Sequence, residues 1–455
     1  MFNRKLNVLL SMVCFSLPSV AAEKTLFSFD WLSPFNAAQT GSNPNGTLLR
    51  DSSGALYGTN MVGGRYYNGT VFKLSPPVPG QTDWTLSILY TFTGGSDGGL
   101  PNPDLVMDSS GALYGTTSGG GSWTDEGLVY KLTPPQQAGA QWSLTVIHYF
   151  ESNFLAPTGD GSNPATGLVM DKTGALYGTT DLGGDISDPS GIGAGTVFKL
   201  TPTDAAKTKW DETILYRFKG GTDGANPMTA LILDEAGALY GTTLYGGTGG
   251  CVDLLSSPLG CGTVFQLSPP APGNSAWNKT TLHQFGGGQS DGAMPQARLM
   301  LGASGSLYGT TFQGGSGGCT DMLLTVIGCG TVFELKPPAA TQKGWTETIL
   351  HTFTGPDGAF PQGGVVTDES GALFGATSGG GPSSYGVGGF GVLYKLTPPG
   401  FGQTLWAHTD VYDFDIRDSG TEAIGELVRD PQGHFFGVTY SGGANYGGTV
   451  YEIAP

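Results

Sequence analysis

The sequence predicts an all-β fold, a single seven-bladed β-propeller of four-stranded blades, from two observations. The motif GALYGTT at residues 174–180 is written seven times with small changes, and no stretch has the apolar spacing of a helix. The spacings between copies are 57, 63, 63, 68, 66 and 62 residues. Repetition at such a period indicates stacked units that bury their apolar faces against one another. The motif glycines are Gly54, Gly111, Gly174, Gly237, Gly305, Gly371 and Gly433.

One repeat, residues 166–218, shows the four strands in order. GLVMD and ALYGTT are two short apolar runs joined by an Asp-Lys-Thr-Gly turn, which predicts a tight hairpin. A glycine-rich loop then leads to GTVFKLTP, whose valine and phenylalanine favour a third strand. The fourth strand is WDETILYRF, and a DGANP loop leads into the next repeat. Four strands in about 60 residues are typical of a propeller blade.

The fourth strand follows only six of the seven repeats. The six copies begin at Trp84, Trp142, Trp210, Trp277, Trp345 and Trp406. The missing copy is matched at the other end of the chain by TLFSF, residues 25–29. We therefore expect the N-terminal strand to complete the last blade, because closure of the ring removes open sheet edges.

These motifs together resemble a known family. LYGTT, GTVFKL, Pro-Pro, LYxF and DGxxP in seven copies are similar to the Gloeobacter-Verrucomicrobium extracellular tandem repeat, called GloVer, over essentially the whole mature chain. The resemblance implies an exported bacterial protein and brings no known activity with it. Other members carry C-terminal anchors, and no such segment follows the seventh repeat, which ends GTVYEIAP.

The first residues and the charge indicate the compartment. Residues 1–22 combine Arg4 and Lys5, an apolar run and a small-residue end, which predicts a signal peptide followed by a propeller at residues 23–455, with no transmembrane segment. The net charge of −17 argues against nucleic-acid partners. Four cysteines in two equally spaced pairs predict local disulfides Cys251–Cys261 and Cys319–Cys329 in a secreted protein, extracellular or periplasmic.

The DGxxP loops and the glycine-rich loops are expected on one face, here called the DGxxP face. Its aspartates are weak candidates for metal ligands, because oxygen donors in loops suit calcium. Asp-Gly is also an ordinary turn, and one carboxylate per blade is too dispersed for a single ion. We therefore predict no cofactor and keep calcium as an alternative. The candidates are Asp97, Asp160, Asp223, Asp291 and Asp357.

Residues that break the repeat give two candidate sites. Asp104, Arg298 and Glu426 occupy one repeat position before the innermost strand, so we expect them near the channel mouth as candidate catalytic residues. The alternative is that they only solvate a wet channel. The second candidate is an aromatic binding surface in the loops, where exposed rings suit sugars or peptides and where local packing is the alternative. Its residues are Trp31, Arg65, Tyr66, Tyr67 and Trp123.

No nucleophile elbow, zinc-protease motif or phosphate loop is present in the sequence. A binding protein is therefore favoured over an enzyme, with extracellular polysaccharide or protein as its partner. The first alternative is a carbohydrate-active or lactone-cleaving enzyme that uses the acidic residues, with calcium as an optional requirement. The second is a structural component of a secreted matrix.

Overall fold

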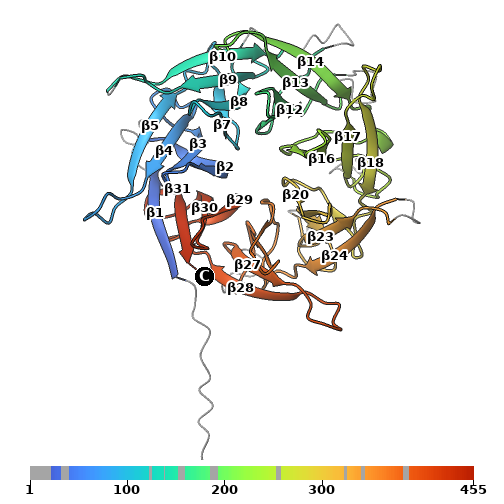
Figure 1. Cartoon of the computed structure of the whole chain (residues 1–455). Helices are drawn as coiled ribbons and strands as arrows, with labels where there is room; N and C mark the ends of the chain where they lie inside the picture. Colours follow the sequence, from blue (N-terminus) through green and yellow to red (C-terminus); the bar gives the residue numbers. More distant parts are fainter. Residues whose placement is uncertain are drawn as a thin grey trace, which may run out of the picture.

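The fold is a closed ring of seven small sheets around a central axis (Figure 1). The computed structural model describes residues 22–31, 40–121, 125–137, 139–151, 159–184, 193–252, 258–321, 325–339, 344–382 and 389–454. Residues 1–21, which contain most of the predicted signal peptide, lie outside the described residues. In the part of the chain that the structure describes, no helix has the length and apolarity needed to span a membrane.

The first three blades follow one another along the chain. Blade 1 contains β2 (Ser42–Arg50), β3 (Leu56–Val62), β4 (Thr70–Ser75) and β5 (Thr85–Thr91). Blade 2 contains β6 (Gly99–Pro101), β7 (Val106–Met107), β8 (Leu113–Gly119), β9 (Leu128–Thr133) and β10 (Ser143–Tyr149). Blade 3 contains β11 (Val169–Met170), β12 (Leu176–Thr180), β13 (Thr196–Pro202) and β14 (Trp210–Arg217), and the short 3-10 turn η1 (Gly221–Asp223) follows it.

The remaining blades complete the ring. Blade 4 contains β15 (Ile232–Leu233), β16 (Leu239–Thr243), β17 (Thr263–Ser268) and β18 (Asn278–Gln284). Blade 5 contains β20 (Met300–Leu301), β21 (Leu307–Thr311), β23 (Thr331–Lys336) and β24 (Thr346–Thr352), beside the small pair β19 (Gly292–Ala293) and β22 (Gln313–Gly314). Blade 6 contains β25 (Val366–Thr367), β26 (Leu373–Ala376), β27 (Val392–Thr397) and β28 (Ala407–Asp413), and blade 7 contains β29 (Thr421–Arg429), β30 (Phe435–Ser441), β31 (Tyr446–Ala454) and β1 (Ala22–Asp30).

The N-terminal strand closes blade 7, as the sequence predicts. Strand β1 pairs antiparallel with β31, from Ala22 opposite Ala454 to Asp30 opposite Tyr446, and the two lie side by side in Figure 1. The last blade is therefore built from both ends of the chain.

Aromatic contacts join each blade to the next at one repeated position. The phenylalanine that ends each outermost strand packs against the aromatic residue of the third strand in the following blade, with ring centroids 5.1 or 5.2 Å apart. Such edge-to-face pairs add to the area that they bury. The pairs are Phe29–Phe72, Phe92–Tyr130, Phe150–Phe198, Phe218–Phe265, Phe285–Phe333, Phe353–Tyr394 and Phe414–Tyr451.

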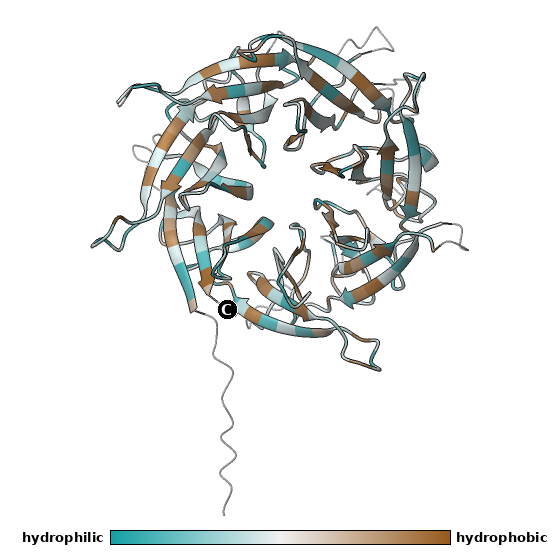
Figure 2. Ribbon diagram, in the orientation of Figure 1, coloured by the Kyte–Doolittle hydropathy of each residue, from teal (hydrophilic) through white to brown (hydrophobic). Residues whose placement is uncertain are grey.

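The outermost strands are amphipathic. Figure 2 shows hydrophobic and hydrophilic residues alternating along them, since one side of each strand packs against a neighbouring blade and the other faces solvent. The tryptophans at their starts are half-buried and pack on the aromatic residue of the GALYGTT motif one blade earlier, as Trp210 does on Tyr114 at 6.0 Å. They are packing residues.

Five of the seven innermost strands are shorter than the five-residue apolar runs suggest, whereas β2 and β29 have nine residues each. Strands β7, β11, β15, β20 and β25 each have only two residues. The chain before each pair leaves the sheet ladder and lines the centre of the ring instead. This departure from the ladder frees the positions that form the candidate site.

Candidate functional site

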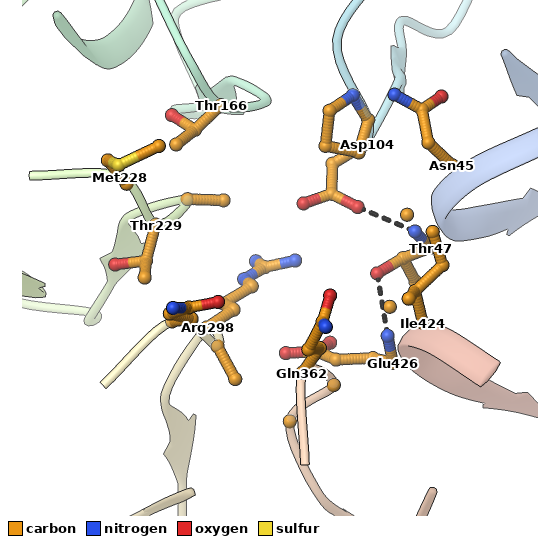
Figure 3. A pocket seen from close by; sticks show the side chains of 18 of the residues that line it. Asn45, Thr47, Asp104, Thr166, Met228, Thr229, Arg298, Gln362, Ile424 and Glu426 are labelled. Carbon is orange, nitrogen blue, oxygen red and sulfur yellow. Dashed lines mark hydrogen bonds between the residues drawn. The ribbon is translucent and has the colours of Figure 1, made fainter. Parts of the chain in front are cut away.

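A cavity of about 170 Å³ occupies the centre of the ring, and all seven blades contribute to its wall. Its residues come from the segments directly after the DGxxP loops, so it opens toward the DGxxP face. Polar and apolar groups both line it, and Met228 and Ile424 contribute to the apolar part (Figure 3). The structure brings Asp104 of blade 2, Arg298 of blade 5 and Glu426 of blade 7 into this one cavity.

Asp104 is held in place by its own backbone and by blade 1. Its φ of 65° is left-handed, a conformation that aspartate adopts more readily than most residues. One carboxylate oxygen accepts a hydrogen bond from the backbone N–H of Thr47 at 2.9 Å, and the carboxylate faces the cavity (Figure 3). The Thr47 hydroxyl also accepts a hydrogen bond from the backbone N–H of Glu426 at 3.1 Å. Thr47 therefore connects the two acidic residues.

Glu426 has the most perturbed carboxyl group in the cavity. Burial raises its pKa to about 7, the Arg298 guanidinium lowers it in part, and the Asp104 carboxylate raises it further. A Cβ on Gly364 would lie 2.7 Å from Oε1 of Glu426, so glycine at that position leaves room for the carboxyl group. A carboxyl group that titrates near neutral pH can both donate and accept a proton under physiological conditions.

Arg298 is a cation without a close counter-ion. Figure 3 shows its guanidinium reaching into the cavity between Asp104 and Glu426. Among the described residues, no carboxylate oxygen lies within 4 Å of it and no hydrogen bond forms to it. The guanidinium can therefore offer its fork of N–H donors to a ligand.

The predicted aromatic surface is only partly assembled. Arg65 and Tyr66 stack at 5.6 Å and line a groove of about 320 Å³ between blades 1 and 2, with Tyr90 and Trp142 on its other walls. Tyr67 is 59% exposed beside them. Trp31 is 55% exposed, its backbone N–H donates to the carbonyl oxygen of Asn445 in blade 7, and it is not among the described residues that line this groove. Trp123 lies outside the described residues.

The DGxxP aspartates lie around the rim, one per junction between blades, and do not converge. Asp97 and Asp223 accept hydrogen bonds from Tyr90 at 3.0 Å and Tyr216 at 2.8 Å. They also accept bonds from backbone N–H groups of their own loops, which is the structural role of an Asp-Gly turn. No single ion can be shared by these five carboxylates.

At three junctions, however, the aspartate meets a histidine and a side chain from the next blade. The repeat pattern in the sequence did not lead us to predict these clusters. The missing signal was the second residue after each strand-four tryptophan, which reaches back to the preceding blade. The clusters are His148–Asp160–Glu212, His283–Asp291–Glu347 and His351–Asp357–His408.

Both predicted disulfides form. Cys251 is bonded to Cys261 in blade 4, and Cys319 is bonded to Cys329 in blade 5. Exposed Val252 and Val326 lie inside these loops, whose central residues 253–257 and 322–324 are outside the described residues.

The repeat profile of one family matches the chain in three overlapping segments. The Gloeobacter/Verrucomicrobia repeat is found at residues 15–255, 193–387 and 325–455. The chain belongs to the Gloeobacter/Verrucomicrobia repeat family. No curated protein sequence matches it.

Several solved structures are similar to this member of the repeat family. A gluconolactonase from Xanthomonas campestris has 12% identity and a TM-score of 0.39, with 95% of this chain and 89% of that chain covered. The extracellular domain of a one component system from B. thetaiotaomicron has 10% identity and a TM-score of 0.47, covering 94% of this chain and 40% of that chain. Likenesses at this level bear on neither the activity nor the ligand of this protein.

Proposed function

We propose that this protein is an exported binding protein that takes a small sugar acid, such as the uronic acid residue of an extracellular glycan, in the central cavity. The observation that carries the proposal is Arg298, whose guanidinium faces the cavity without a counter-ion within 4 Å. A guanidinium binds a carboxylate through two parallel hydrogen bonds, which fixes both its position and its orientation.

The rest of the cavity suits the remainder of such a ligand. The volume of about 170 Å³ is below that of a drug-sized pocket, so it fits one small ring and not a long chain. Met228 is 39% exposed in its wall and can cover an apolar sugar face. Glu426, with its pKa raised to about 7, is partly protonated at neutral pH and then donates a hydrogen bond instead of repelling the acid.

Export is part of the proposal and is supported by the two disulfides, which form in oxidising compartments. The pattern of residues 1–22 adds to this support.

Calorimetric titration of the mature chain with glucuronate, galacturonate and glucose tests the proposal, each with calcium and with chelator. Binding of an acid, absence of glucose binding and loss of affinity in Arg298→Gln are expected. Arg65→Gln, which changes the groove between blades 1 and 2, is the matched control and should bind normally. Equal affinity for acid and neutral sugar, or full binding by Arg298→Gln, would refute it. Binding that requires calcium would instead support the alternative in which the protein uses calcium as a cofactor.

The raised pKa of Glu426 favours a second function, hydrolysis of a sugar lactone or glycoside by general acid-base catalysis. Asp104 would then stabilise positive charge or orient water opposite Glu426. Incubation with aldonolactones and uronic oligosaccharides tests this function through release of product. Glu426→Gln should abolish turnover and keep ligand binding, whereas binding without turnover in the unaltered protein would leave only the first function. Absence of both would favour the structural matrix role.

A further inference from the structure

The junctions between blades form a natural series at one repeated position. Each contains a residue near the end of an outermost strand, the DGxxP aspartate that follows it, and a residue from the outermost strand of the next blade. At junction 1/2 these residues are Tyr90, Asp97 and Leu144, and at junction 3/4 they are Tyr216, Asp223 and Lys279. The same position at junction 4/5 holds His283, Asp291 and Glu347.

The tyrosine junctions satisfy their polar groups. The Tyr90 hydroxyl donates to Asp97, and the facing residue of the next blade is the apolar Leu144. At junction 3/4 the Tyr216 hydroxyl donates to Asp223, and the Lys279 ammonium lies 3.0 Å from the same carboxylate. Each aspartate therefore accepts a hydrogen bond. The next blade adds no charge at junction 1/2, and at junction 3/4 it adds Lys279, which pairs with Asp223.

Junction 4/5 is different because two of its buried polar atoms have no hydrogen-bond partner. Nε2 of His283 and Oε1 of Glu347 are both buried and unpaired. Nε2 forms long ion-pair contacts, 3.4 Å from Oε2 of Glu347 and 3.7 Å from Oδ2 of Asp291, and both distances exceed that of an ordinary hydrogen bond. The three side chains are 15–19% exposed, so water reaches them poorly. Unpaired buried polar atoms are costly, and two in one cluster point to a missing partner.

We propose that His283, Asp291 and Glu347 bind a divalent transition cation, Zn²⁺, between blades 4 and 5. Ligands about 2.0 to 2.1 Å from a tetrahedral zinc lie roughly 3.3 Å apart, and the observed separations of 3.4 and 3.7 Å approach this value. One imidazole and two carboxylates suit zinc, whereas calcium requires six to eight oxygen ligands. The cation supplies the missing partner of Nε2 of His283, and it also reaches the unpaired Oε1 of Glu347 if that carboxylate binds through both of its oxygens.

The surroundings hold these ligands in place. Backbone N–H groups of Gly286 and Gly292 both donate to the Asp291 carboxylate at 2.6 Å. A Cβ on Gly287, in the same loop, would lie 2.7 Å from Sγ of Cys261, so the first disulfide packs directly on the loop. Outer partners that orient a ligand strengthen metal binding.

The two other histidine clusters are less suited to zinc. At junction 2/3 the same three residue types recur, with Nε2 of His148 3.1 Å from Asp160 and 3.6 Å from Glu212. The positive charge of Arg217 acts on Glu212 there, however, and opposes a second cation. At junction 5/6 the rings of His351 and His408 are stacked at 4.4 Å with planes 15° apart, so their lone pairs run parallel and do not converge.

The series supplies its own test variant. His283→Tyr with Glu347→Leu converts junction 4/5 to the residue types that junction 1/2 already uses, so the variant should fold. The mature protein is stripped with chelator, dialysed against Zn²⁺ and analysed for bound metal by mass spectrometry and for its melting temperature. The unaltered protein should hold zinc and melt at a higher temperature with zinc than with chelator. The double variant should lose one zinc per chain and that increase.

His351→Tyr at junction 5/6 is the matched control and should retain all the zinc. The proposal is overturned if the unaltered protein holds no zinc, which would mean a histidine shared by two carboxylates without a metal. It is also overturned if the double variant keeps the metal content and the zinc-dependent melting temperature of the unaltered protein.

Discussion

The rings of Phe29 and Phe72 lie with their centroids 5.2 Å apart. Phe29 belongs to the outermost strand of blade 7, and Phe72 belongs to the third strand of blade 1. The same contact recurs at the six junctions that the chain makes by simple succession. Blade 7 therefore packs on blade 1 through the same aromatic contact that joins the other six pairs of neighbouring blades. The junction that closes the ring does not differ from them in this contact.

Phe29→Ala tests this closure. Phe29 is fully buried, so removal of its ring should lower the free energy of unfolding by about 3 to 5 kcal/mol through lost burial and a new cavity. Thermal unfolding measures the loss. Phe401→Ala, on a fully exposed loop residue, should leave the melting temperature unchanged. A wild-type melt for Phe29→Ala would mean that β1 does not complete the ring.

Asp108 in the blade 2 hairpin turn predicts a loss of stability in acid. Burial alone would raise its pKa, but hydrogen bonds from Ser110 and Tyr114 and the nearby Lys207 lower it to about 2. A carboxyl group with a lowered folded pKa stabilises the fold above its unfolded pKa of about 4 and stops doing so as the pH falls through about 2. Asp108→Asn should cost about 2 kcal/mol at pH 7 and little at pH 2, measured by urea unfolding at both values. If Asp108→Asn lowered the free energy of unfolding equally at pH 7 and pH 2, ionisation of Asp108 would not be the source of its stabilising effect.

Glu426 predicts the opposite dependence on pH. Its pKa is raised from 4.5 to about 7 by burial, so the folded state holds its proton more tightly than the unfolded state. Stability therefore falls as the pH rises from about 4.5 to about 7, since ionisation is favoured in the unfolded chain. Glu426→Gln should gain about 1 to 3 kcal/mol relative to wild type at pH 8 and nothing at pH 4. A difference that is constant over this range would show that Glu426 does not titrate in the cavity.

The first disulfide is expected to stabilise blade 4 directly. Cys251 and Cys261 close a loop with a sequence separation of 10, and Cys261 is buried in the core between blades 4 and 5. Replacement of both by serine should lower the free energy of unfolding by about 2 to 3 kcal/mol. Comparison of reduced with oxidised wild-type protein provides the control. Reduction breaks both disulfides, so it should lower stability by as much as serine replacement of Cys251 and Cys261 together with serine replacement of Cys319 and Cys329. An unchanged melt would show that the loop has no role in stability.

Leu100 offers a substitution that should increase stability. It has a φ of 52°, and the equivalent residues Asn43, Asn163 and Asn226 have φ values of 56°, 53° and 56°. Asparagine adopts this left-handed conformation several-fold more often than leucine does. Leu100→Asn should therefore raise stability by about 0.5 kcal/mol, after some loss of apolar contact. Leu100→Ala, which removes contact without conformational gain, should lower the melting temperature. A decrease for both would contradict the strain argument.

The ring was predictable because its elements are local and repeated. The GALYGTT spacing determines the blade count, and the six strand-four tryptophans with TLFSF determine the closure. The convergence of Asp104, Arg298 and Glu426 was also expected, since one repeat position in a closed ring faces one axis. Their catalytic role stays a prediction.

The junction clusters were not predictable by the same reasoning. His283 and Glu347 are 64 positions apart in the chain and meet only because each outermost strand extends across the neighbouring blade. The size of that overlap depends on strand twist and on the bulge that shifts the register between Val264 and Phe265 of β17 and their partners in β18. Neither quantity is contained in a repeat pattern.

The pairing of β1 with β31 also bears on how the protein is made. Glu23 and Ile453 lie opposite each other in this pair, although they are 430 positions apart in the chain (453 − 23). Blades 1 to 6 can fold from neighbouring strands as they appear, while β1 has no partner until β31 is present. A chain interrupted before Tyr446 would expose β1 and the edge of β30, which are templates for aggregation. Closure of the ring thus depends on a strand pair that only chains extending through β31 can form.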